Sequence, residues 1–242
     1  MNGLSKTDLA ALLEIIHDCV HCTSRTEFVR IAKKLGVLLE AENLVFLSSE
    51  LEFASHPAAI HEINVSYPRE WTDIYREQQF VRIDPIFNAG RTGLIYWRDL
   101  YHEFPPDREF LGQAESFGLC NGFSHILADR SSFGLMSVAD PGLRDCERTR
   151  TILDTVAPHF HQLSVRMLHR MKREQLPHLT PRERDVLLWA MEGKSNWEIS
   201  VILGIGRESV KGHMANILHK LDAANRAQAV AIALQYDLLL PE

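Results

Sequence analysis

Apolar residues recur at helical spacing in two segments near the start of the chain. Between Thr7 and about His21, the apolar residues that share one helical face are Leu9, Leu12, Leu13 and Ile16. Ser24 and Glu27 then have the spacing of a capping box, in which each residue's side chain bonds the other's backbone N–H. The pattern therefore predicts two consecutive helices, the second opening at this box and running through Leu39.

Short apolar runs bounded by turn residues predict strands further along. These runs lie at 44–48, 60–66, 119–127 and 133–139. Helical patterns separate them at about 69–79 and 108–117, and a long helix is expected from about 145 to 171. Strands interleaved with helices favour an α+β domain, in which helices cover the faces of a sheet.

After residue 176 the pattern is helical throughout. Two capping boxes, Thr180–Glu183 and Ser195–Glu198, open two helices, the first with Pro at its first helical position. The second helix is short and ends at a Gly-containing turn, 204–206, before a longer helix at 207–221. Asn225 is the predicted cap of a last helix. A short helix, a tight turn and a longer helix are typical of a DNA-binding helix-turn-helix.

The composition is that of a globular protein with room for two domains. The chain has 242 residues, of which 45% are hydrophobic and 24% charged. A polar segment ending in Pro177 predicts a domain at 1–165, a linker at 166–176 and a second domain at 177–242. Four scattered cysteines do not form a disulfide framework. Because the chain lacks an export signal and a long apolar run, we expect a cytoplasmic protein without a membrane segment.

Net charge does not by itself indicate a nucleic-acid binder, since the formal value is -6. Residues 177–242 carry seven Lys and Arg against eight Asp and Glu, so DNA binding would depend on local placement of charge. The helix at 207–221 buries one apolar stripe, and its opposite face carries the candidate DNA-binding residues Arg207, Glu208, Lys211 and Ala215. A structural bundle with a solvated face is the alternative that this pattern leaves open.

Aromatic residues with polar tips gather in one segment of the N-terminal half. On a helix, Tyr67, Trp71 and Tyr75 would share a face and form an apolar wall with hydrogen-bonding edges. Asp84 follows among apolar neighbours, where a carboxylate is costly unless it is hydrogen-bonded. Pro85 favours an extended backbone at Asp84. An aromatic core stripe and an exposed Asp-Pro turn remain alternatives.

One cluster suggests a metal or redox site. His17 and His21 stand one helical turn apart, with Cys19 and Cys22 beside them, but no second cluster supplies an obvious fourth ligand. Enzyme chemistry has less support, because the chain lacks a Gly-rich phosphate loop and a G-x-S-x-G nucleophile motif. We therefore expect no catalytic residue, no metal and no cofactor, with lactonase activity as the enzyme alternative.

The C-terminal segment closely resembles the LuxR-type helix-turn-helix over nearly all of 177–242. The motifs that carry the resemblance are 179–187, 193–195, 198–199, 210–213, 220–221 and 225–226. Glu183, Leu187 and Gly193 fall where the family keeps its characteristic residues. The resemblance implies a four-helix DNA-binding domain in which Lys211 and position 215 face the major groove.

The first half resembles, over about 10–165, the ligand-binding domain of the acyl-homoserine-lactone receptors, the quorum-sensing branch of that family. The matching residues are Tyr67, Trp71, Tyr75, Asp84, Pro85, Trp97, Gly122 and Ser137. The resemblance implies that Asp84 accepts the amide N–H of the ligand and that Trp71 donates to its lactone carbonyl. Tyr67, helped by Ser137, would donate to the acyl carbonyl. Tyr75 and Trp97 would pack against the lactone.

Phe123 and His125 depart from this branch, whose members usually have small or apolar residues there, and we expect them to shorten or reshape the pocket. The fold implied is an α-β-α sandwich with an antiparallel sheet, followed by a tetrahelical helix-turn-helix domain. The long helix near 145–171 is a candidate dimer surface.

The expected function is a quorum-sensing transcription regulator that binds an acyl-homoserine lactone and, as a homodimer, an inverted-repeat promoter site. Its candidate partners are DNA, the lactone, a second copy of the chain and RNA polymerase. A regulator that responds to another acylated or aromatic signal is one alternative. A metal or redox sensor built on His17, Cys19, His21 and Cys22 is another.

Overall fold

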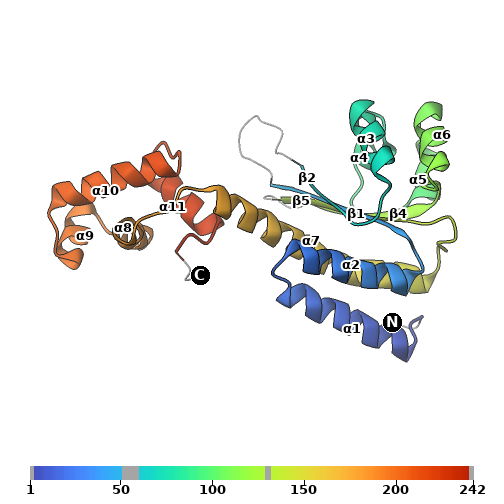
Figure 1. Ribbon diagram of the computed structural model, residues 1–242, viewed down its shortest axis with the longest axis horizontal. Helices are drawn as coiled ribbons and strands as arrows, with labels where there is room; N and C mark the ends of the chain where they lie inside the picture. Colours follow the sequence, from blue (N-terminus) through green and yellow to red (C-terminus); the bar gives the residue numbers. More distant parts are fainter. Residues whose placement is uncertain (1–2, 51–59, 129–131, 240–242) are drawn as a thin grey trace. The chain divides into compact units, whose positions relative to one another are not determined.

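The chain divides into two compact units, Met1–Leu168 and His169–Glu242. The computed structural model describes residues 3–50, 60–128 and 132–239 (Figure 1). Within these residues, no helix has the length and apolar character needed to cross a bilayer.

Two paired helices begin the first unit. Helix α1 spans Lys6–His21 and helix α2 spans Arg25–Leu39, close to the predicted bounds. The predicted capping box between Ser24 and Glu27 is confirmed, and α1 opens with an equivalent box that the sequence analysis missed.

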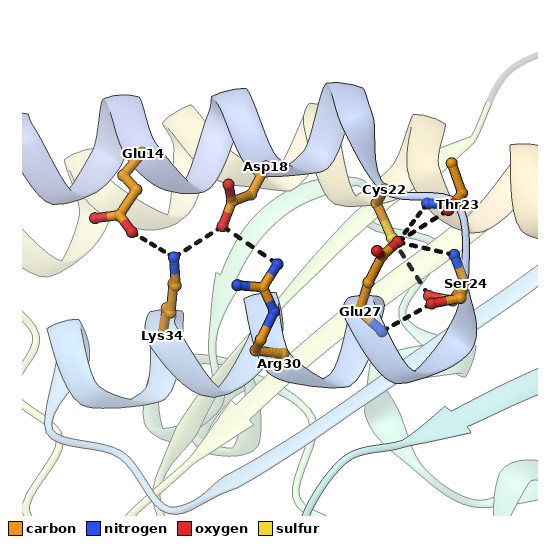
Figure 2. A network of polar contacts seen from close by, with 8 residues as sticks. All are labelled: Glu14, Asp18, Cys22, Thr23, Ser24, Glu27, Arg30 and Lys34. Atoms are coloured by element: carbon orange, nitrogen blue, oxygen red, sulfur yellow. Dashed lines mark hydrogen bonds and ion pairs between the residues drawn. The ribbon is translucent and has the colours of Figure 1, made fainter.

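Ion pairs join the exposed sides of these helices (Figure 2). Lys34 of α2 is paired with Glu14 and, at 2.8 Å, with Asp18 of α1. The hydrogen bond from Lys34 holds the pKa of Asp18 below its usual value. Such exposed pairs contribute little to stability, so the apolar faces of the helices carry most of the packing energy.

A five-stranded antiparallel sheet forms the centre of the first unit, in the order β2-β1-β5-β4-β3. The strands are β1 Asn43–Glu50, β2 His61–Asn64, β3 Gly93–Tyr96, β4 Gly122–Ala128 and β5 Ser132–Ala139. Four of them were predicted, with bounds shifted by a few residues. The sequence analysis missed β3, because its four residues are too few to show alternation.

Helices cover both faces of this sheet, as Figure 1 shows. One face is covered by short elements: α3 Arg69–Glu77, η1 Phe80–Arg82, α4 Pro85–Asn88, α5 Trp97–Glu103 and α6 Arg108–Ser116. The other face is covered by α2 and α7, with α1 beyond them and paired with α2, through a core that includes Phe28, Phe46 and Phe160. The predicted α-β-α sandwich is confirmed.

Helix α7 spans Glu147–Gln175 and is longer than predicted. Its apolar side, which includes Ile152, Val156 and Phe160, is fully buried against the sheet. The predicted helix end near Met171 is wrong, because the polar residues that suggested a linker at 166–176 form the last turns of α7 up to Gln175. A polar composition marks an exposed helix as readily as a loop.

The second unit is a four-helix domain. After the end of α7 it contains α8 Pro181–Met191, α9 Asn196–Leu203, α10 Arg207–Lys220 and α11 Arg226–Gln235. Thr180, Ser195 and Asn225 cap three of these helices as predicted, whereas Gly206 before α10 offers no side-chain cap. The tetrahelical fold is confirmed.

Candidate functional site

A cavity of about 460 Å³ lies between the sheet and helices α3 to α6, and we call it the sheet pocket. Its lining includes every residue predicted to bind ligand: Tyr67, Trp71, Tyr75, Asp84, Trp97 and Ser137. Apolar side chains supply much of the remaining wall, among them Val45, Leu47, Ile86, Phe87, Phe110, Ala114, Leu119 and Leu135. The structure thus brings together residues that lie up to 70 positions apart in sequence, from Tyr67 to Ser137.

Asp84 is the buried carboxylate of the pocket. It caps α4 from an extended backbone conformation, as Pro85 predicts, and only 7% of its surface is exposed. Its Oδ1 accepts a hydrogen bond from the N–H of Ile86 at 2.9 Å, and its Oδ2 accepts one from the hydroxyl of Tyr75 at 2.8 Å. Burial outweighs these bonds and raises the pKa of Asp84 to about 6. The exposed Asp-Pro turn considered above is therefore wrong.

An aromatic wall stands beside this carboxylate. Tyr67 precedes α3 rather than sharing its helical face, so the predicted i, i+4, i+8 arrangement holds only for Trp71 and Tyr75, whose ring centroids are 5.6 Å apart. The hydroxyl of Tyr67 and the indole N–H of Trp71 have no hydrogen-bond partner in the described part of the chain, and both residues line the pocket. Burial raises the pKa of Tyr67, which keeps its hydroxyl protonated and able to donate.

Ser137 belongs to a short hydrogen-bonded chain at the sheet. The indole N–H of Trp97 donates to Oγ of Ser124 at 2.8 Å, and Oγ of Ser124 lies 2.7 Å from Oγ of Ser137. The Trp97 ring lies close to β4 because Gly122 has no side chain. A Cβ there would stand 2.6 Å from the carbonyl oxygen of Val138 and 3.0 Å from the Trp97 ring. Trp97 therefore offers the pocket its ring and not its N–H.

The sequence analysis missed Tyr101. This residue follows Trp97 by one turn of α5 and lines the pocket, and its hydroxyl has no hydrogen-bond partner among the residues described. Burial raises the pKa of Tyr101, so its hydroxyl stays a donor. The i, i+4 spacing from Trp97 could have indicated this residue had α5 been recognised as a helix.

Phe123 and His125 do not reach the sheet pocket, so the expectation that they reshape it is wrong. Phe123 belongs to the core on the α7 side of the sheet, where its ring stacks on Tyr96 at 4.7 Å. His125 places Nε2 at 3.4 Å from Oδ1 of Asp154 on α7. Alternate residues of β4 face opposite sides of the sheet. Ser124, which lies between Phe123 and His125, therefore faces the side of the sheet on which the pocket lies.

The proposed metal cluster near the end of α1 is not supported. Cys19 and Cys22 are buried, and burial raises the pKa of the Cys19 thiol to about 12. The Cys22 thiol donates to the carbonyl oxygen of Ser24 at 3.4 Å (Figure 2). Nowhere in residues 3–50, 60–128 and 132–239 do three or more His, Cys, Asp or Glu side chains gather so as to hold a metal ion.

The second unit presents a polar helix face. The predicted DNA-binding residues are all exposed on α10: Arg207, Glu208, Lys211 and Ala215. Val210 and Ile217, on the opposite face of α10, are fully buried. Nζ of Lys211 lies 2.7 Å from Oε1 of Glu208, so this cation is partly neutralised on its own helix.

Two family models match the chain. The one described as bacterial regulatory proteins of the luxR family matches residues 177–233, and the one described as the autoinducer binding domain matches residues 24–163.

Known transcription regulators are similar to this chain over most of its length. The HTH-type quorum sensing-dependent transcriptional regulator RpaR of Rhodopseudomonas palustris is 36% identical over 194 residues, covering 76% of this chain and 79% of that protein. The HTH-type quorum-sensing regulator RhlR of Pseudomonas aeruginosa is 31% identical over 185 residues, covering 74% and 76%. A structure of SdiA in complex with octanoyl-rac-glycerol covers 99% of both chains with a TM-score of 0.62 and 21% identity, which supports the fold.

Proposed function

This chain belongs to the luxR family of bacterial regulatory proteins, as a DNA-binding transcription regulator with an autoinducer-binding domain, and we propose that its signal is an N-acyl-homoserine lactone held in the sheet pocket. One observation carries the proposal. The buried carboxylate of Asp84 lines the same largely apolar cavity as the Tyr67 hydroxyl and the Trp71 N–H, two donors without a hydrogen-bond partner among the described residues. Such a combination suits a neutral ligand with an N–H, carbonyl oxygens and an apolar tail.

Each polar group of the ligand has a candidate partner. The amide N–H would donate to the carboxylate of Asp84. The indole N–H of Trp71 would donate to the lactone carbonyl, and the hydroxyls of Tyr67 and Ser137 would donate to the acyl carbonyl. Tyr75 holds Asp84 in position through its hydroxyl and, with the ring of Trp97, would pack against the lactone.

The acyl tail would lie along the apolar wall formed by Leu47, Ile86 and Leu135. A volume of about 460 Å³ falls in the usual range for a small-molecule pocket. A second candidate is an acylated signal without an amide, because SdiA, which shares the fold, has been solved with octanoyl-rac-glycerol. Octanoyl-glycerol has no amide N–H, so its free hydroxyls would have to donate to the carboxylate of Asp84 instead.

We further propose that α10 enters the major groove of DNA with Arg207, Lys211 and Ala215 toward the bases and phosphates. Two copies of the chain, joined through the segment near 145–171, would match an inverted-repeat operator. In this proposal residues 1–165 bind the signal, residues 177–242 bind DNA, and RNA polymerase is a partner at the promoter. The protein would act in the cytoplasm, where its DNA is.

The class of signal can be tested by mass spectrometry. The full chain is expressed in cells supplied with a panel of acyl-homoserine lactones and with octanoyl-glycerol, then purified and extracted. The proposal expects one intact acyl lactone in about a one-to-one ratio with protein. Recovery of octanoyl-glycerol, or of no acyl compound, would contradict it. Hydrolysed lactone in excess over a protein-free incubation would favour lactonase activity instead.

A further inference from the structure

The hydrogen bonds that link Trp97, Ser124 and Ser137 run in one direction from donor to acceptor, which the distances alone do not give. Trp97, Ser124 and Ser137 are linked in that order by contacts of 2.8 Å and 2.7 Å. Ser124 and Ser137 are register partners on β4 and β5, so the sheet itself holds the two hydroxyls together. Ser137 lines the sheet pocket, whereas Ser124 is fully buried and is not among the described residues that line it.

The donor at one end sets the direction. An indole N–H can only donate, so Ser124 must accept from Trp97. The single hydrogen of the Ser124 hydroxyl then needs an acceptor of its own, and Oγ of Ser137 is the acceptor within reach. If Ser137 donated instead, Ser124 would accept twice and its own hydrogen would be buried without a partner, which proteins rarely tolerate.

We propose that Ser124 is a positioning residue for ligand recognition: by accepting the N–H of Trp97 it turns its own O–H onto Ser137, which leaves the O–H of Ser137 free to donate to a carbonyl oxygen in the sheet pocket. The inference rests on the proposed function, because it states how the pocket distinguishes a carbonyl oxygen from a weaker acceptor. Trp97 acts at a distance from the ligand carbonyl, and its N–H serves to fix the orientation of two hydroxyls.

Gly122 makes the hydrogen bond from Trp97 to Ser124 possible. Without a side chain at this position, the Trp97 ring lies close enough to β4 for its N–H to reach Ser124, two residues along the strand. Bonds in such a row strengthen one another, since each hydroxyl that accepts becomes a better donor. The donor presented by Ser137 is therefore stronger than that of an isolated serine.

Titration calorimetry with the full chain tests this role. The probes are N-octanoyl-L-homoserine lactone and its thioamide analogue, in which a poor acceptor, sulfur, replaces the acyl carbonyl oxygen. Ser137→Ala is expected to weaken binding of the amide about three- to ten-fold and to reduce the preference for amide over thioamide. Ser124→Ala is expected to do the same, although Ser124 does not line the pocket.

Combining the two substitutions separates positioning from packing. Because Ser124 acts through Ser137, the double variant should bind no more weakly than Ser137→Ala alone. Ser124→Thr, which keeps the hydroxyl, should retain the preference for the amide. Ser48→Ala, at another buried serine of the sheet, should match the wild type. Losses that add in the double variant, or an effect of Ser124→Ala below two-fold, would overturn the proposal.

A measurement without ligand tests the direction of the Trp97–Ser124–Ser137 hydrogen bonds separately from the lactone proposal. If the wild type binds neither probe, the lactone proposal fails. The NMR resonance of the Trp97 indole N–H still decides the direction of the hydrogen bonds between Ser124 and Ser137. When Ser124 donates to Ser137, Ser137→Ala weakens the Trp97 hydrogen bond and moves its proton resonance upfield. When Ser137 donates to Ser124, the same substitution strengthens that bond and moves the resonance downfield, which would overturn the inference.

Discussion

The hydroxyl of Tyr75 donates a hydrogen bond of 2.8 Å to Oδ2 of Asp84. Together with the N–H of Ile86 on Oδ1, this bond uses two of the roughly four acceptor positions of the carboxylate. Asp84 can therefore accept the N–H of a ligand without losing Tyr75.

Removing the charge of Asp84 should weaken signal response by about ten-fold or more, because an amide at this position cannot accept from every donor that faces it. The measurement is the lactone concentration giving half-maximal expression of a reporter gene for wild type, Asp84→Asn and Trp71→Phe. Ser48→Ala is the matched control for a buried substitution in the same unit. A shift below about two-fold in both pocket variants would count against the assignment of these residues.

Ligand affinity should fall below about pH 6. Burial raises the pKa of Asp84 from 3.8 to about 6, so the folded, ligand-free protein takes up this proton more readily than the unfolded chain. The N–H of a ligand favours the ionised form, and calorimetry should give roughly ten-fold weaker binding at about pH 5 than at about pH 7.5. Asp84→Asn should remove most of this dependence.

The same shift has the opposite sign for the stability of the free protein. A carboxyl group with a raised pKa stabilises the folded state fully below its unfolded value, 3.8, and this contribution is lost as the pH rises through about 6. The stability difference between wild type and Asp84→Asn should follow that course. A difference independent of pH would contradict the burial of an ionisable Asp84.

Gly122→Ala should destabilise the first unit and disturb the pocket. Its Cβ would stand 2.6 Å from a backbone oxygen of β5, which cannot move without distorting the sheet. We expect a loss of about 1–3 kcal/mol in the free energy of unfolding. Gly112→Ala is the matched control, since a Cβ at Gly112 on α6 meets nothing within 4 Å and should be neutral or stabilising. Equal effects of the two substitutions would contradict this account.

The sequence predicted the chemistry of the pocket better than its geometry. The types and spacing of Trp71, Tyr75 and Asp84 carried the resemblance that predicted residues lining one cavity, whereas the spacing alone left a core stripe open. The role of Ser124 depends on its register with Ser137, which links two strands and cannot be read from either one. His125 was expected in the pocket because one residue of strand register decides which face a side chain occupies.

The second unit was predicted more completely, because its helices carry their own signals. Capping residues such as Thr180, Ser195 and Asn225 act within a single turn, so local sequence is enough to find them. The end of α7 was predicted too early because no local signal of this kind marks it. No capping residue near Met171 marks an end, and only polar composition suggested one.

Lys220→Met should destabilise the DNA-binding unit. Glu183 is 3% exposed, and its Oε2 lies 2.7 Å from Nζ of Lys220. Burial alone would raise the pKa of Glu183, but the bonds from Lys220 and Thr180 outweigh it and hold the pKa below its usual value. Removing the lysine leaves a buried charge, which costs about 3 kcal/mol. Chemical denaturation measures the loss.

The exposed pair on α10 supplies the control for that experiment. Lys211→Met breaks a contact between side chains that are 51% and 81% exposed and should change stability by less than about 0.5 kcal/mol. If both substitutions cost the same, Glu183 is not held by Lys220 as the structure indicates.

Lys211→Ala should weaken DNA binding while leaving the fold intact. A lysine that contacts a phosphate contributes about one unit to the slope of log affinity against log salt concentration. Gel-shift titrations at several salt concentrations should therefore show weaker binding and a smaller slope than the wild type. Lys172→Ala on α7, outside the proposed DNA-binding helix, is the control. An unchanged slope for Lys211→Ala would place this residue away from the phosphates.

The most direct test of the proposed signal site is a crystal structure of the full chain with the acyl lactone that extraction identifies. The account predicts the ligand in the sheet pocket, with its amide nitrogen about 2.7–3.2 Å from a carboxylate oxygen of Asp84. A ligand bound elsewhere, or one in the pocket whose amide nitrogen faces away from Asp84, would contradict it.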